Sequence, residues 1–191
     1  SLLAHVVHCL DLAGAPAVSL LCIDAWPGIS PYHGLGQLSP AQLASCWGRQ
    51  RPLSPAQRAY AGAVDRAFAS GDDAALAALA AVDPAPLPWM PAALLRALAE
   101  RPDPRSGLGR LASLALAAVQ AGARRPTAIM RAVAQADTPP QYWGDTTLWG
   151  VLNGLVGSGR LRLRGPAARL PQWPDGADPD DFTLEPAHSQ G

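Results

Sequence analysis

The chain contains no lysine: all 15 basic residues among its 191 residues are arginines, and 15 acidic residues bring the formal net charge to zero. This balance excludes a uniformly basic nucleic-acid-binding protein. Charged residues make up only 16% of the chain, below the roughly 25% of an average domain. Hydrophobic residues nevertheless reach 49%, which is enough for a buried core and excludes a wholly disordered chain.

Long apolar runs and cysteine pairs are also missing. No apolar run approaches the roughly 18 residues that a membrane-spanning helix needs, so we expect no membrane association. The first 48 residues contain no Lys or Arg, so we expect no secretory signal. The three cysteines lack Cys-x-x-Cys spacing, which indicates neither a disulfide framework nor a zinc ribbon. Together these absences favour a reducing, cytoplasmic location.

An apolar run, VSLLCI at residues 18–23, follows an amphipathic helix expected over residues 1–14. A run of this length predicts a strand buried on both faces, as in a parallel sheet. The nearby sequence offers no partner strand. We therefore expect either that part of an α/β unit precedes Ser1 or that this strand lies on a helical body.

Helix-start signals recur through the rest of the chain. LSPAQ occurs at 38–42 and again at 53–57, where Ser39 and Ser54 are predicted N-caps and Gln42 and Gln57 complete capping boxes. Further helices are expected over residues 72–82, 91–100, 108–121, 126–136 and 145–157, the last with Asp145 as N-cap. The breaker-rich segment 101–109 is the predicted domain boundary.

The last expected helix is followed by RLRLR at residues 160–164, whose alternation puts the leucines on one face and the arginines on the other. Three helices followed by a basic strand is the order of a winged helix-turn-helix. The predicted fold is therefore mostly α, with a small α/β element at the N-terminus and a multi-helical body over residues 1–105. A winged-helix-like unit is expected over residues 106–172, and an acidic, disordered tail over residues 173–191.

Arginine concentrates in the predicted winged-helix-like unit and the segment before it. Residues 96–164 contain ten arginines and four acidic residues, whereas residues 165–191 contain one arginine and five acidic residues. The candidate residues for binding a partner or nucleic acid are Arg124, Arg125, Asn153, Arg160, Arg162 and Arg164. The helix expected over 145–157 carries few base-reading side chains, and its Gly150 and Gly154 would let another backbone approach closely. These features favour a non-catalytic binding or regulatory module of unknown partner, in which the helix serves a protein interaction or internal packing. Sequence-tolerant DNA binding through the arginines is the alternative.

A second alternative is an enzyme whose site lies near the end of the predicted strand at 18–23 and is incomplete in this chain. Asp24 closes that strand and His33 lies in the glycine-rich loop beyond it, the region where α/β proteins place functional groups. The Gly-Leu-Gly at 34–36 lacks the rest of a dinucleotide-binding fingerprint, so no cofactor is expected.

A metal site near the start of the chain is the remaining candidate. His5, His8 and Cys9 have the spacing of one helix face, a geometry that metals can use. No second cluster completes the ligand set, so we expect a packed helix end and no metal.

Three stretches together carry a resemblance to a known family: residues 34–54, residues 87–110 and residues 142–155. Their motifs and order are similar to those of a bacterial family of uncharacterised proteins, catalogued as domain of unknown function 1835. In that family a GLG-x-L-x-P-x-x-L motif precedes an arginine-rich turn, and a G-D-x-x-[FL]-W helix comes last. The resemblance implies no established activity, but it implies longer relatives with further strands at the N-terminus. This chain departs from the family at Leu111 and Ala112, where members often have Thr-Glu.

Overall fold

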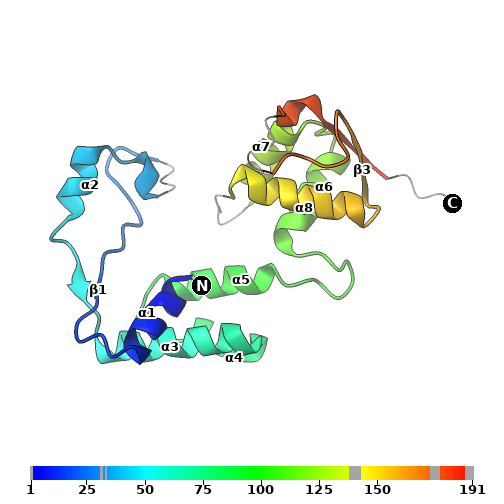
Figure 1. Ribbon diagram of the computed structural model, residues 1–191. Coiled ribbons are helices and arrows are strands. Elements are labelled where there is room, and N and C mark those ends of the chain that lie inside the picture. The colour runs from blue at the N-terminus through cyan, green and yellow to red at the C-terminus, as the bar shows by residue number, and fades with distance from the viewer. Residues whose placement is uncertain (1, 31, 33, 138–142, 173–176, 188–191) are drawn as a thin grey trace. The chain divides into compact units, whose positions relative to one another are not determined.

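A computed structural model describes residues 2–30, 32, 34–137, 143–172 and 177–187 of the chain (Figure 1). The structure is 53% helical. The described residues form eight α-helices and two small antiparallel sheets. The mostly helical prediction is confirmed. Within the described residues, none of the helices is both long and apolar enough to cross a membrane. The chain divides into two compact units, Ser1–Leu98 and Ala99–Gly191.

The first unit is built on four helices: α1 (Leu2–Leu12), α3 (Pro55–Ser70), α4 (Asp73–Ala80) and α5 (Met90–Ala99). In Figure 1, α1 lies alongside α3, and these two helices make the most extensive contact in the unit. The core between the helices is formed by small and branched side chains, with Ala4, Val64, Leu76 and Leu94 fully buried. Such small side chains let helices approach closely, which fits the alanine-rich sequence.

The remaining elements of the first unit are short. They are the 3-10 helix η1 (Leu35–Gln37), α2 (Pro40–Cys46) and the two-residue strands β1 (Ser19–Leu20) and β2 (Arg51–Pro52). Both predicted capping boxes are confirmed. The Ser39 and Ser54 hydroxyls accept hydrogen bonds from the backbone N–H groups of Gln42 and Gln57. The side chains of these glutamines accept in turn from the backbone N–H groups of the two serines.

The buried parallel strand predicted over residues 18–23 is wrong. Only Ser19 and Leu20 are in a strand, which pairs antiparallel with β2, and Ser19 and Cys22 are exposed. The apolar side chains of Val18 and Leu20 instead pack onto the helical core from one side. An apolar run covers a helical surface as well as a sheet interior, so the run alone does not identify an α/β element.

The second unit contains α6 (Arg110–Gln120), α7 (Pro126–Ala136), α8 (Asp145–Gly157), β3 (Leu161–Arg164), the 3-10 helix η2 (Pro179–Asp181) and β4 (Thr183–Pro186). The predicted bounds of α7 and α8 are confirmed, although Gly144 rather than Asp145 is the N-cap of α8. Its core includes Leu111, Ile129, Leu148, Trp149 and Leu152.

The two strands of the second unit pair antiparallel, with Leu163 opposite Leu184 and Arg162 opposite Glu185. β4 also bonds to a residue outside the sheet, because the Leu184 N–H donates to the Arg124 carbonyl at 2.8 Å. Arg124 lies between α6 and α7. β4 therefore connects the hairpin to the loop between the first two helices of the unit.

The disordered tail predicted from residue 173 is wrong for residues 177–187. These residues form η2 and β4, and Phe182 and Leu184 are completely buried in the core of the second unit. The acidic composition concealed two apolar side chains at alternate positions, which is the pattern of a half-buried strand. Residues 173–176 and 188–191 lie outside the described part of the chain.

The boundary between the units lies before residue 99, earlier than the boundary after residue 105 that the sequence indicates. Glu100 already belongs to the second unit, since its Oε2 accepts a hydrogen bond from the Leu111 N–H at 3.1 Å. A Cβ on Gly109 would collide with the Glu100 carbonyl oxygen. The segment expected to be a linker is therefore fixed against the start of α6.

Candidate functional site

The most distinctive exposed surface of the second unit is one face of α8. Leu148, Trp149, Leu152 and Leu155 bury the opposite face. On the outer face, Thr147, Gly150 and Gly154 are exposed at helical spacing. A Cβ added at Gly150 or at Gly154 would meet no atom within 4 Å. The internal packing of the unit therefore does not require glycine at either position.

Asn153 is not available to a partner, which overturns its predicted role. The residue is 8% exposed, and its side chain bonds to the backbone of Leu170 through both amide atoms. Oδ1 accepts from the Leu170 N–H at 2.8 Å, and Nδ2 donates to the Leu170 carbonyl at 3.1 Å. Asn153 thus replaces a backbone partner for Leu170 and fixes the loop after β3 to α8.

The three arginines of the predicted basic strand have different surroundings. Arg160 is half-buried, and its Nη2 donates to the Ser106 carbonyl at 2.5 Å. Arg164 lies 3.4 Å from Glu185 of β4, and the two side chains are 71% and 38% exposed. Arg162 is exposed, and its side chain has no hydrogen bond or ion pair within the described part of the chain. Of the three, Arg162 is the one that the unit leaves open to a partner.

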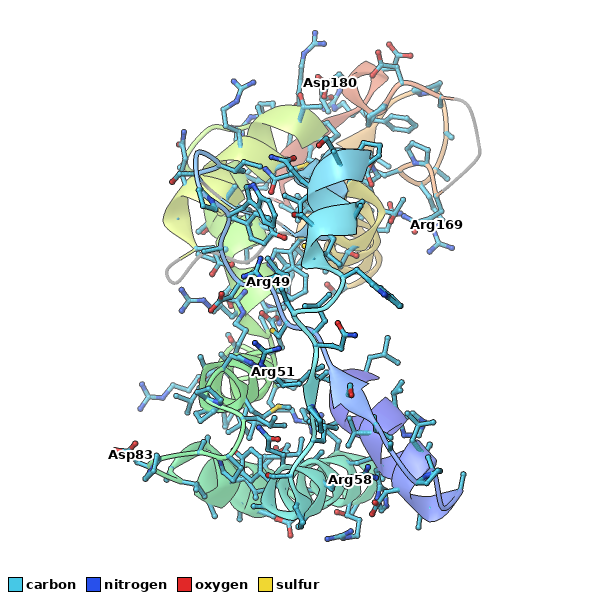
Figure 2. The ribbon with its side chains drawn as sticks, turned by 90° about the vertical axis from the view of Figure 1, so that its left-hand side faces the viewer. Arg49, Arg51, Arg58, Asp83, Arg169 and Asp180 are labelled. Carbon is cyan, nitrogen blue, oxygen red and sulfur yellow. The ribbon has the colours of Figure 1, made fainter. Side chains whose placement is uncertain are left out.

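Arg124 and Arg125 precede α7 and are exposed, but both are engaged within the unit. Arg124 Nη1 donates to the Val119 carbonyl, and Arg125 Nη1 donates to the Asp180 carbonyl at 3.0 Å. The carboxylate of Asp180, labelled in Figure 2, accepts from the Thr127 N–H at 3.1 Å and from the Thr127 hydroxyl at 2.5 Å. The acidic C-terminal segment thus lies against the first turn of α7, where a negative charge is favoured by the helix dipole.

These contacts predict an acid-sensitive link. The Thr127 hydroxyl, the Thr127 N–H and the charges of Arg125 and Arg131 hold the pKa of Asp180 below its ordinary value of 3.8, although burial opposes them. A carboxylate with a lowered folded-state pKa stabilises the fold above its unfolded pKa, and this stabilisation is lost as the pH falls through the folded value. The protection factors of the α7 amides, which correct for the pH dependence of intrinsic exchange, should therefore fall as the pH is lowered below about 5.

The Asp180→Asn variant provides the comparison for this acid effect. It should exchange faster than the natural protein at about pH 6 and show a smaller acid effect, because it has no carboxylate to protonate. Asp181→Asn is the matched control, since Asp181 is adjacent and exposed. Equal acid effects in the natural protein and in Asp180→Asn would contradict the assignment.

Sequence reasoning missed Asp180 and Thr127 because it treated the acidic segment as disordered. A signal was present: Asp-Pro at 178–179 is a helix-start pattern, and Asp178 does cap η2. The alternation of Phe182 and Leu184 was the second signal.

The candidate enzyme site near β1 is only partly described. Asp24 is exposed, and His33 lies outside the described residues. Beside β1 lies a cavity of about 230 Å³, whose wall includes Leu20, Cys22, Arg49 and Arg51 but not Asp24. Burial, together with the charge of Asp24, raises the pKa of the Cys22 thiol. The arginines in this wall were not among the sequence-based candidates, and only their Arg-x-Arg spacing marked them.

The histidines of α1 are used for packing between helices. His5 Nδ1 lies 3.1 Å from the Asp65 carboxylate on α3, and Cys9 Sγ lies 3.6 Å from His5 Nε2. His8 does not join this group, because its ring lies over Gly62. Within the described residues, no three His, Cys, Asp or Glu side chains are arranged to bind a metal ion.

Comparison of the chain with known protein families, with curated proteins and with solved structures finds no match in any of the three. The resemblance to the family catalogued as domain of unknown function 1835 therefore stays a prediction.

Proposed function

We propose that the second unit is a winged-helix-like module that binds a protein partner through the exposed face of α8 and catalyses no reaction. The order of its elements supports this proposal. α6 is followed by a loop that contains Arg124, then by α7 and α8, and finally by the paired strands β3 and β4. The hydrogen bond from the Leu184 N–H to the Arg124 carbonyl places the Arg124 backbone beside β4, on the side away from β3. In a winged helix-turn-helix that binds DNA, the helix in the position of α8 enters the major groove. In this unit, we assign the corresponding face to a protein partner.

The observation that carries the proposal is the open space around Gly150 and Gly154. Glycine within a helix costs up to about 1 kcal/mol relative to alanine, and alanine would fit at both positions without a contact. Two such positions, four residues apart on one exposed face, leave the backbone of α8 uncovered. Glycine is used where another chain must approach a backbone closely. A protein partner that packs directly onto α8 explains why both positions are glycine.

A protein partner fits the charges better than DNA does. The described residues of the second unit carry ten arginines and eight acidic residues, so the surplus seen over residues 96–164 is largely offset by the C-terminal segment. Arg125, Arg160 and Arg164 contact groups of their own unit. Asp145 lies exposed at the start of α8, where it would repel a phosphate backbone.

Site-specific photo-crosslinking in the protein's own cells tests the proposal. A photoreactive residue replaces Thr147 on α8 and, as the matched control, Gln120, which is exposed on α6. We expect a discrete crosslinked protein from position 147 and none from position 120. Gly154→Arg should abolish the adduct, because a long side chain would hold the partner away from the helix. Adducts of equal yield from both positions, or insensitivity to Gly154→Arg, would overturn the proposal.

A titration with labelled duplex DNA at two salt concentrations separates the DNA alternative. Phosphate contacts produce a steep salt dependence, which falls when a contacting arginine is removed. Under the proposal the protein shows no duplex binding at low salt. Binding that weakens with salt and with Arg162→Gln would instead support a DNA partner.

A further inference from the structure

The first unit contains a second candidate binding surface, which does not depend on the function proposed for the second unit. It is the cavity of about 230 Å³ beside the paired strands β1 and β2. Its apolar side is formed by Leu20, Pro52 and Leu53. Leu20 and Leu53 also pack onto the helical core of the unit. The Leu53 N–H donates to the Val18 carbonyl at 2.9 Å, which extends the pairing of β1 with β2 by one bond.

The polar side of the cavity is lined by two arginines and by no acidic residue, and the nearby charge of Asp24 acts on the Cys22 thiol from outside the lining. Arg49 and Arg51 line it together with Gln57 and the Cys22 thiol. Figure 2 labels both arginines, Arg49 just before β2 and Arg51 as the first residue of β2. Neither guanidinium has an ion pair with the described residues; one nitrogen of Arg51 donates to the neighbouring Gln50 carbonyl at 3.0 Å. Gln57 is occupied, because its side chain closes the capping box of α3 and donates to the Pro86 carbonyl.

We propose that this cavity binds the phosphate group of a small ligand through Arg49 and Arg51. Two guanidinium groups match the charge of a phosphate monoester, which is about −1.5 to −2 near neutral pH. Each guanidinium presents a planar set of donors that fits phosphate oxygens in pairs. An anion between the two arginines also removes their mutual repulsion.

The size of the cavity limits the ligand. Pockets for drug-sized molecules begin at roughly 300 Å³, so a cavity of about 230 Å³ accepts a phosphate group with only a small organic part. Leu20 and Pro52 provide an apolar contact for that part. The expected ligand class is therefore a small phosphorylated metabolite or inorganic phosphate itself.

Cys22 provides a direct readout of occupancy. It is exposed and lines the cavity. Cys9 is also exposed but lies on α1, outside the cavity lining, and Cys46 is buried. The full-length protein is alkylated with iodoacetamide at about pH 9, where even a thiol with a raised pKa is partly ionised. Alkylation of each cysteine is followed by peptide mass spectrometry, in phosphate and in chloride of equal ionic strength.

Inorganic phosphate should protect Cys22 in a saturable way and leave Cys9 unchanged. At a phosphate concentration about ten times the dissociation constant, the alkylation rate of Cys22 should fall about tenfold, because only unoccupied protein reacts. Arg49→Gln and Arg51→Gln should each abolish the protection. Arg66→Gln, a change at an exposed position on α3, should retain it.

Three outcomes would overturn the proposal. They are no protection of Cys22 up to high phosphate, equal protection in Arg49→Gln and in the natural protein, and slowing of Cys9 together with Cys22. The last outcome would show a general ionic effect. None of these measurements involves the second unit, so their failure would leave the proposed protein-binding function standing.

Discussion

Phe182→Ala is expected to lower the free energy of unfolding of the second unit by about 3–5 kcal/mol. The Phe182 side chain is 0% exposed and belongs to the core that α6, α7 and α8 form. The Phe182 ring occupies the space that a Cβ on residue 165 would need, which accounts for glycine at that position. Removing the ring would therefore leave a cavity between the hairpin and the helices. Hydrogen exchange of the α8 amides at Leu152 and Leu155 measures the loss.

Two changes nearby frame this result. Asp181→Ala removes an exposed neighbour of Phe182 and should change stability by less than about 0.5 kcal/mol. Gly165→Ala should destabilise the unit by about 1–3 kcal/mol, because the methyl group would displace the Phe182 ring. If Phe182→Ala and Asp181→Ala exchanged at equal rates, residues 177–187 would not belong to the folded unit.

Arg110→Ala is expected to be the second large loss, at about 3–5 kcal/mol. Arg110 Nε donates to the Asp137 carboxylate at 2.9 Å, and the Asp137 side chain is 0% exposed. The pair joins the first turn of α6 to the C-terminal end of α7. Without the guanidinium, a buried carboxylate would lose a positive partner, which costs far more than an exposed pair contributes.

The control for Arg110→Ala is Arg105→Ala, a change of the same kind at an exposed position in the same unit, for which we expect less than about 0.5 kcal/mol. Urea denaturation, monitored through the hydrogen exchange of α6 and α7 amides, gives the change in the free energy of unfolding for both variants. Arg110→Ala combined with Asp137→Leu should recover part of the stability, because an apolar side chain tolerates burial without a partner. A double variant less stable than Arg110→Ala alone would contradict the account.

Local signals explain why the helices could be predicted from the sequence. The caps at Ser39 and Ser54, and the proline that begins α7, act within a few residues of the positions that they fix. The alternation of β3 is equally local. These elements therefore agree between sequence and structure.

Partners distant in sequence explain what could not be predicted. The sequence does not show whether Asn153 lies on the buried or on the exposed face of α8. Its hydrogen bonds to the backbone of Leu170 explain why this polar side chain is buried. The arginine surplus likewise looked like a free basic surface. Arg125 and Arg164 meet Asp180 and Glu185 only after the C-terminal segment folds back. Pairing over such separations has no signature within a local window.

The bond from Leu184 to Arg124 has a consequence for the synthesis of the protein. α6, α7 and α8 leave the ribosome before β4 does, and until then the pocket that Phe182 and Leu184 fill is empty. The nascent helices therefore expose apolar surface to chaperones, and the cooperative folding of the unit waits for residues near 187 to emerge. We therefore expect the folding of the second unit to depend on the synthesis of β4, whereas the contacts within residues 1–98 can form before β4 is made.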